Sequence, residues 1–421
     1  MLKNKITGLV FVEVFIAVAS FLALPLFLGM MLKDEIGEFS YLQAFYSSWM
    51  LIASLSAYTL LLKNISTNND PVQKAQNITS AMLLSIGGII GSASLLLIVG
   101  FFVMPSSVGS EMGARLEFFY LIFFIVIINV MNLNLLSILI AEENLITLIK
   151  FKVLRGLGSI GFGLLIVNGS YFSENAVFNR LAAIALIECV VFILFFKPFM
   201  RSFIINRAVI SSLLPQFIVI MPLVLSSIIA LAQNMTEKSL LIAYVGSKAM
   251  AEYGLALVIV SPISMIMTAI MNSWVVSFYE IVSPNKARNA LISMAVKLGV
   301  IFTIMIGGLT LMSWLLLFFE VFPSVYWALI YDVPALGVGA LLISLNQLNY
   351  AAFLYAEKTS FQLISTCFSA VILGIVSVIL IPVAGKFGAI VAFISAAAGG
   401  FLCGSIFAHR AFNDMVSGKG K

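Results

Sequence analysis

The sequence is poor in charged residues. Only 10% of its 421 residues are Asp, Glu, Lys or Arg, whereas a typical soluble domain has about 25%. Hydrophobic residues make up 62% of the chain, and the mean hydropathy is +1.13. This balance excludes a soluble globular domain and places most of the chain in lipid. The formal net charge of +5 requires no nucleic-acid partner, because the basic residues gather on one side of the apolar runs.

Groups that bind metals or carry out catalysis are also scarce. The only histidine is His409, and Cys189, Cys367 and Cys403 lie inside apolar runs, where they cannot form a disulfide framework. No cluster of His, Cys and carboxylate residues has the spacing of metal ligands. The longest polar connection, Lys63–Ser80, is too short to form an extramembrane catalytic domain. We therefore expect no cofactor, no metal site and no enzymatic activity.

What the sequence does contain is a series of long apolar runs. Runs of about 20 apolar residues can cross a bilayer as helices, and they predict about twelve transmembrane helices. The predicted spans are residues 6–31, 39–62, 81–104, 118–140, 149–167, 181–200, 211–233, 247–273, 290–319, 328–355, 361–383 and 387–412. We predict an all-α integral membrane protein with two pseudo-symmetric six-helix lobes, residues 1–200 and 211–421. A basic amphipathic connector at residues 201–210 would join them on the membrane surface.

Lys and Arg are distributed unevenly between the two sides that the spans define. Seventeen of the 23 fall on the side that holds both termini and the connector, and six fall on the other side. Cytoplasmic loops are enriched in Lys and Arg. The count therefore predicts that both termini are cytoplasmic.

Amide side chains gather in the middle of the fourth and tenth spans. They are Asn129, Asn132 and Asn134 in the fourth, and Asn346, Gln347 and Asn349 in the tenth. Residues 132–149 and 347–364 are identical at 7 of 18 aligned positions, which favours two homologous halves. Because an amide in hydrocarbon must find a partner or line a wet cavity, we predict that these residues, with Asn272, line a polar transport path. Hydrogen bonding between helices is the alternative.

Two carboxylates lie deep inside apolar spans. Glu13 is about 10 Å deep in the first span at 1.5 Å per residue, and Glu188 lies at a similar depth in the sixth. A charged carboxylate that faces lipid is costly. We therefore predict that either residue takes up a proton or Na⁺ during transport. The alternative is a fixed structural pair, for instance with Arg155.

Several short stretches in the second half carry a resemblance to a known family. They are Ala251-Glu-Tyr253-Gly254-Leu-Ala256-Leu, Asn272-Ser-Trp274-Val-Val-Ser-Phe-Tyr279, Tyr355-Ala-Glu-Lys358-Thr359 and Leu380-Ile-Pro382-Val-Ala-Gly385-Lys-Phe-Gly388-Ala389. These stretches, together with the number of spans, resemble the Wzx-type oligosaccharide-lipid flippases. That family belongs to the polysaccharide transporters of the multidrug/oligosaccharidyl-lipid/polysaccharide (MOP) exporter superfamily, which has a MATE-like fold.

The resemblance implies a flippase of the bacterial inner membrane. It would move an undecaprenyl-diphosphate-linked oligosaccharide from the cytoplasmic to the periplasmic leaflet by alternating access, for O-antigen (lipopolysaccharide), capsule or exopolysaccharide synthesis. The cations for the diphosphate would come from Arg155, Arg180, Lys248 and Lys297. For Arg155, Lys248 and Lys297 the alternative is snorkelling to lipid headgroups. The implied partners are the lipid-linked oligosaccharide, membrane lipid, H⁺ or Na⁺ as coupling ion, and the polymerase and chain-length proteins of the same pathway.

Two other functions stay open from the sequence. A MATE-like antiporter of small molecules or cations should carry a compact pair of carboxylates in one lobe. A membrane-embedded polysaccharide polymerase should carry acidic or arginine residues in a large periplasmic loop.

Overall fold

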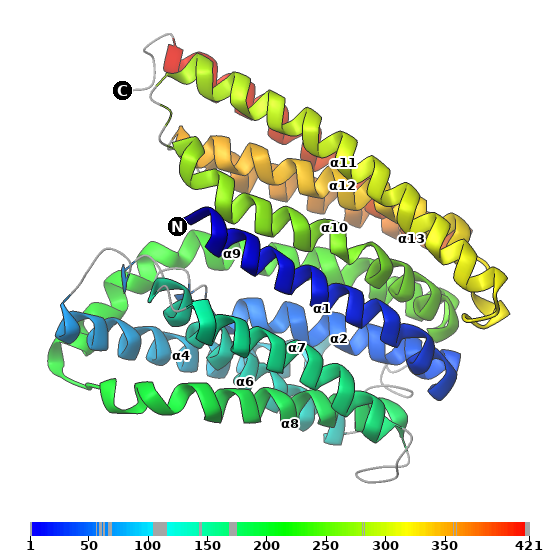
Figure 1. Ribbon diagram of the computed structural model, residues 1–421, viewed down its shortest axis with the longest axis horizontal. Helices are drawn as coiled ribbons and strands as arrows, with labels where there is room; N and C mark the ends of the chain where they lie inside the picture. Colours follow the sequence, from blue (N-terminus) through cyan, green and yellow to red (C-terminus); the bar gives the residue numbers. More distant parts are fainter. Residues whose placement is uncertain are drawn as a thin grey trace. The chain divides into compact units, whose positions relative to one another are not determined.

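The computed structural model describes residues 2–55, 57–58, 61, 64–65, 70–103, 116–142, 145–167, 175–279, 281, 283–356, 358 and 360–416. In these ranges the regular structure is helical, and no β-strand is present. The long helices are α1 (Leu2–Met30), α2 (Lys33–Ala53), α4 (Pro71–Val103), α6 (Leu116–Ala141), α7 (Leu145–Val167), α8 (Ala176–Phe196), α9 (Arg207–Val245), α10 (Ser247–Tyr279), α11 (Pro284–Phe318), α12 (Leu329–Tyr355) and α13 (Ser360–Val416) (Figure 1). Two short 3-10 helices, η2 (Lys197–Ser202) and η3 (Ser324–Tyr326), complete the set in the described ranges. The predicted all-α fold class is confirmed.

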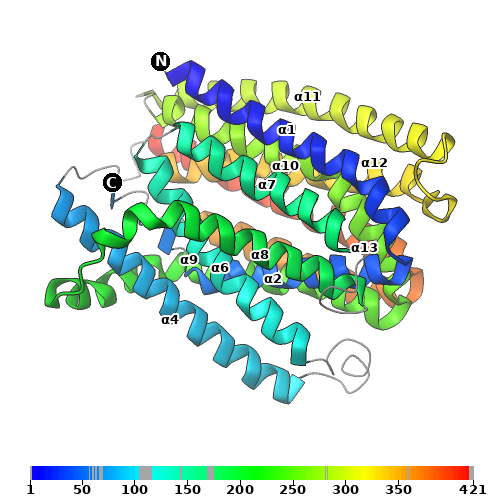
Figure 2. The same cartoon turned by 60° about the horizontal axis from the view of Figure 1, so that its bottom comes forward.

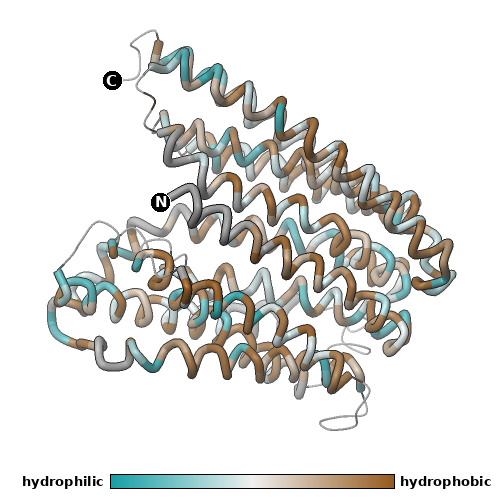
Figure 3. The backbone as a smooth tube through the Cα atoms, in the orientation of Figure 1, coloured by the Kyte–Doolittle hydropathy of each residue, from teal (hydrophilic) through white to brown (hydrophobic). Residues whose placement is uncertain are grey.

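Each predicted membrane span overlaps one of these helices. Seven helices in the described part of the chain (α4, α6, α8, α10, α11, α12 and α13) are long and apolar enough to cross a membrane. Figure 3 shows hydrophobic residues along most of their length. Large apolar side chains such as Leu165 and Ile304 are more than 70% exposed, which suits a surface in contact with lipid.

The last two predicted spans lie in one helical run, α13, which bends at Gly385. The backbone of Gly385 has φ 58° and ψ −132°, outside the helical region. Glycine adopts positive φ without a steric penalty, and Pro382, one turn earlier, removes a backbone donor from the helix. The bend therefore separates the two predicted spans without a loop.

The chain divides into two compact units. The central unit is Leu22–Met235, and the C-terminal unit joins Met1–Phe21 to Thr236–Lys421. Because the divisions fall inside α1 and α9, each of these helices contributes to both units. The lobes at residues 1–200 and 211–421 stay a prediction.

In the central unit, α8 packs against α6 and α7, and α2 packs against α4 and α6 (Figure 2). The fully buried Trp49 of α2 joins three of these helices. Its indole Nε1 donates a hydrogen bond to Ser92 Oγ of α4 at 2.9 Å. Its ring centroid lies 5.9 Å from that of Phe119 and 5.8 Å from that of Phe123, both of α6. An indole packed this way satisfies its N–H and buries a large apolar surface.

In the C-terminal unit, α12 packs against α10, α11 and α13 (Figure 1). The bend in α13 brings Gly388 close to the part of the helix that precedes the bend. A Cβ added at Gly388 would lie 2.4 Å from the carbonyl oxygen of Leu380. Since backbone atoms cannot rotate away, this close approach requires glycine.

We expect Gly388→Ala to destabilise the C-terminal unit by about 1–3 kcal/mol, because the added methyl group overpacks the bend. Gly374→Ala, in the same helix, is the matched control, since no atom lies within 4 Å of a Cβ added there. The melting temperatures of the purified variants in detergent measure both effects. Equal melting temperatures for Gly388→Ala and the native protein would contradict the close approach.

Candidate functional site

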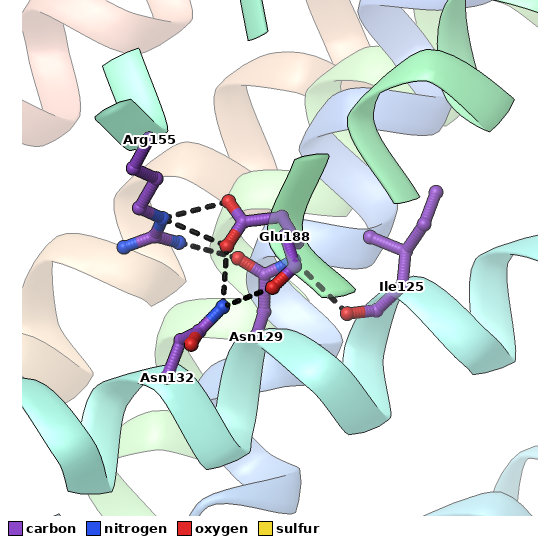
Figure 4. Close-up of polar contacts among 5 residues, drawn as sticks. All are labelled: Ile125, Asn129, Asn132, Arg155 and Glu188. Atoms are coloured by element: carbon purple, nitrogen blue, oxygen red, sulfur yellow. Dashed lines mark hydrogen bonds and ion pairs between the residues drawn. The ribbon is translucent and has the colours of Figure 1, made fainter. Parts of the chain in front are cut away.

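A cluster of four polar side chains lies inside the central unit, formed by Asn129 and Asn132 of α6, Arg155 of α7 and Glu188 of α8 (Figure 4). The guanidinium Nε of Arg155 donates to Glu188 Oε1 at 2.7 Å and to Oε2 at 2.9 Å. A terminal guanidinium nitrogen of Arg155 donates to Asn129 Oδ1. The amide nitrogen of Asn132 donates to Glu188 Oε2 at 2.7 Å and to the backbone oxygen of Glu188 at 3.0 Å. Three helices thus meet at one carboxylate.

The spacing of the two asparagines on α6 explains their roles. Asn129 and Asn132 are three residues apart, so they share one face of the helix. The amide nitrogen of Asn129 donates back to the carbonyl of Ile125 at 2.9 Å, which leaves its oxygen to accept from Arg155. Asn134 lies two residues further on and points elsewhere. It donates to Ser85 Oγ of α4 at 2.8 Å.

The cluster balances one positive and one negative charge in an apolar surrounding. Glu188 is 6% exposed, and a buried carboxylate without a partner would be strongly destabilising. The alternative prediction of a structural pair between Glu188 and Arg155 is confirmed. Arg155 is 26% exposed at its side chain, and in Figure 4 its second terminal nitrogen points away from the carboxylate. That nitrogen has no hydrogen-bond acceptor among the residues that the structure describes. It can donate to an anionic oxygen.

A second cation of the central unit, Arg180 of α8, lies between two aromatic rings. Its guanidinium carbon is 3.9 Å from the ring centroid of Phe27 and 3.7 Å from that of Phe39. A guanidinium nitrogen also lies 3.7 Å from the sulfur of Met31. Stacking of this kind stabilises a cation by about 0.5–2 kcal/mol. The N–H groups of the guanidinium are donors that can bind an anion.

The amides of the C-terminal unit form a network of their own. Asn349 of α12 donates to Asn346 Oδ1 at 3.0 Å, to Ser405 Oγ of α13 at 3.2 Å and to the carbonyl of Phe401 at 3.4 Å. A Cβ on Gly404 would lie 2.3 Å from Asn346 Oδ1, so glycine makes room for the amide. In each unit, one asparagine donates to a backbone carbonyl of a neighbouring helix: Asn132 to Glu188 of α8 and Asn349 to Phe401 of α13.

The remaining predicted site residues lie outside these networks. Gln347 is half-buried, and Lys248 and Lys297 are exposed. The side chains of Glu13 and Asn272 lie outside the described residues. The structure therefore brings together Asn129, Asn132, Arg155 and Glu188 in one unit and Asn346 with Asn349 in the other.

No protein-family model and no curated protein matches the sequence. Solved structures do match. An inward-facing multidrug resistance MATE family transporter of the MOP superfamily superposes with a TM-score of 0.62 and 17% identity, over 97% of this chain and 94% of that chain. A MATE in the straight conformation gives a TM-score of 0.61, 17% identity and 97% coverage of both chains. A MOP superfamily transporter from Pyrococcus furiosus gives 0.60 and 17%, over 97% of this chain and 96% of that chain.

The chain has the fold of a MATE transporter. The predicted MATE-like fold is confirmed, and the neighbours are membrane transporters, in agreement with a multi-pass membrane protein. At 17% identity the likeness establishes the fold.

One charged cluster of the C-terminal unit was not predicted from the sequence. Lys386, directly after the bend of α13, donates to Asp332 Oδ2 of α12 at 2.7 Å and to Glu252 Oε2 of α10. The three residues are far apart in sequence and share no spacing motif. Their one signal is that acidic residues are rare in this chain, so each one beside an apolar span is a candidate. In the described residues, no group of three or more His, Cys, Asp or Glu could hold a metal.

We expect Glu188→Leu to destabilise the protein by about 3 kcal/mol, because it leaves Arg155 inside the helices without its counter-charge. The double variant Arg155→Met with Glu188→Leu should recover most of that loss, since it removes both charges. Thermal unfolding of the two variants measures the difference. Glu142→Leu is the control, because its pair with Lys74 is more exposed and worth about 0–1 kcal/mol. A double variant less stable than Glu188→Leu would contradict the pairing.

Proposed function

We propose that this protein is a flippase that moves a polyprenyl-diphosphate-linked oligosaccharide across the bacterial inner membrane. The observation that carries the proposal is the cluster of Arg155, Glu188, Asn129 and Asn132 within a MATE fold. The cluster combines two kinds of group. The guanidinium of Arg155 has a terminal nitrogen that can still donate, and the amides can both donate and accept hydrogen bonds. This is the chemistry that a substrate with phosphates and sugar hydroxyls requires.

Arg155 is the proposed contact for the diphosphate. Guanidinium N–H groups form charge-assisted hydrogen bonds with phosphate oxygens in a fixed fork geometry. The Nε of Arg155 donates to the Glu188 carboxylate, so the guanidinium is already oriented before the substrate binds. Arg180 is the proposed second cation, because its ring stacking fixes the plane of its donors. Lys248 and Lys297, which are both exposed, are the remaining candidates.

The amides are the proposed contacts for the sugars. Asn132 is fully buried and Asn349 is 4% exposed, so in the present conformation they bond to neighbouring helices. Sugars would reach them in another state of the cycle. Two solved structures of this fold are the inward-facing and the outward-facing conformations of a multidrug resistance MATE family transporter. That precedent supports alternating access as the mechanism here.

A MATE-like antiporter is the second candidate, and one observation favours it. Glu252 and Asp332 form a compact carboxylate pair in the C-terminal unit, as an antiporter of cations would need. Lys386 donates to both carboxylates, which lowers their attraction for a cationic substrate. We therefore rank the antiporter below the flippase.

The proposed setting follows the topology predicted from Lys and Arg. Both termini would face the cytoplasm, and substrate would leave at the periplasmic side. The proposed partners are membrane lipid, H⁺ or Na⁺ as coupling ion, and the polymerase and chain-length proteins that use the exported repeat unit.

A flipping assay in sealed proteoliposomes tests the proposal. A fluorescent lipid-linked oligosaccharide is exposed to a glycosidase that cannot cross the membrane. With the native protein, the glycosidase should cleave nearly all of the labelled lipid-linked oligosaccharide, because molecules from the inner leaflet reach the outer leaflet. Arg155→Lys should slow the digestion at least about tenfold. An ammonium lacks the planar set of N–H donors with which a guanidinium can bond Glu188 and a phosphate at the same time.

Lys150→Met is the control, because Lys150 is exposed on α7, the helix that carries Arg155, and this variant should leave the rate unchanged. The same vesicles loaded with a fluorescent organic cation test the antiporter. Transport of the cation without digestion of the inner-leaflet lipid would overturn the flippase in favour of the antiporter.

A further inference from the structure

A buried acid, base and phenol meet where α9 enters the C-terminal unit. Glu237 and Lys238 of α9 are 3% and 5% exposed, and Tyr253 of α10 is fully buried. The hydroxyl of Tyr253 donates to Glu237 Oε1 at 2.8 Å, and the ammonium of Lys238 lies 3.4 Å from the same oxygen. These are the titratable groups that face the Glu237 carboxyl among the described residues.

The second carboxyl oxygen of Glu237 is buried without a hydrogen-bond donor in the described part of the chain. Leaving a charged, buried oxygen unpaired costs stability. Glu188 differs, because both of its oxygens accept hydrogen bonds from Arg155. Of these two carboxylates, only that of Glu237 has an oxygen, Oε2, that accepts no hydrogen bond in the described part of the chain and can bind a proton.

Glu237 lies beside a division between the two compact units. The division between the two units falls between Met235 and Thr236, inside the continuous helix α9. Glu237 is the second residue beyond that division. A change of charge there acts on α9, one of the two helices through which the chain passes from one unit to the other.

We propose that Glu237 binds the coupling proton of the transport cycle, which rests on the proposed function. The proton adds to Oε2 and converts the carboxylate to a neutral acid, while Tyr253 continues to donate to Oε1. Release returns the proton to water and restores the anion. This assigns the coupling to Glu237 rather than to Glu188, whose carboxylate is held by Arg155.

The surroundings of Glu237 favour its protonated form. Burial raises the pKa of Glu237 above its ordinary value, and the smaller effects of Lys238 and of the Tyr253 hydrogen bond act in the opposite direction. The acid therefore holds its proton to a higher pH than an exposed glutamate does. Lowering the pH fills the site, and raising the pH empties it.

Infrared spectroscopy of the purified protein in nanodiscs tests the site without any substrate. A protonated carboxylic acid has a C=O band that a carboxylate lacks. A pH titration over about pH 5 to 8 should show such a band in the native protein and in Glu320→Gln, a control because Glu320 is exposed. Glu237→Gln should lack it. Its persistence in Glu237→Gln, or its absence from the native protein, would overturn the proposal.

A second variant covers the case in which Glu237→Gln does not fold. Lys238→Gln removes the positive charge beside the carboxyl, so the midpoint of the band should move to higher pH. An unchanged midpoint would overturn the assignment to Glu237.

The transport measurement separates this proposal from the proposed function. In proteoliposomes with a pH gradient, Glu237→Gln should flip lipid-linked oligosaccharide only at the gradient-free rate, while Glu320→Gln keeps the stimulation. Stimulation that persists in Glu237→Gln would contradict coupling through this residue. If the native protein flips no oligosaccharide but the infrared band depends on Glu237, the proton site stands and the substrate assignment fails.

Discussion

A charge inside a helix bundle surrounded by lipid needs an opposite charge or a hydrogen-bond partner. This constraint governs the polar core of the central unit. Arg155 of α7 and Glu188 of α8 neutralise one another, and Asn129 and Asn132 of α6 satisfy the donors and acceptors that remain. The same four residues therefore hold the three helices together.

The same constraint accounts for the other buried charges. Lys386 joins the bend of α13 to α10 and α12 through two carboxylates, and Glu237 is covered by Tyr253 and Lys238. These groups differ in one respect. The Glu188 carboxylate is fully bonded, whereas Glu237 has an oxygen to spare. A fully bonded pair suits a fixed scaffold, and an incompletely bonded acid suits a group that changes its protonation state.

The helices could be predicted from the sequence because apolar runs of membrane-spanning length leave little choice of structure. The pairing of Arg155 with Glu188 could be foreseen as an alternative, since both residues are charged and lie inside apolar spans. The sequence did not show that Asn134 turns toward Ser85, away from Asn132. It also did not show that Lys386 meets Glu252 and Asp332, because contacts between residues so far apart depend on how the helices pack. Glu237 was missed for a related reason: its burial comes from α10, and no local pattern marks it.

The central claim is that Arg155, oriented by Glu188, holds the anionic group of the substrate. A structure of the protein with bound lipid-linked oligosaccharide tests it most directly. The account predicts a phosphate oxygen within hydrogen-bond distance of the free terminal nitrogen of Arg155, with the Arg155–Glu188 contact retained. A diphosphate bound away from Arg155, with that nitrogen still facing no ligand, would contradict it.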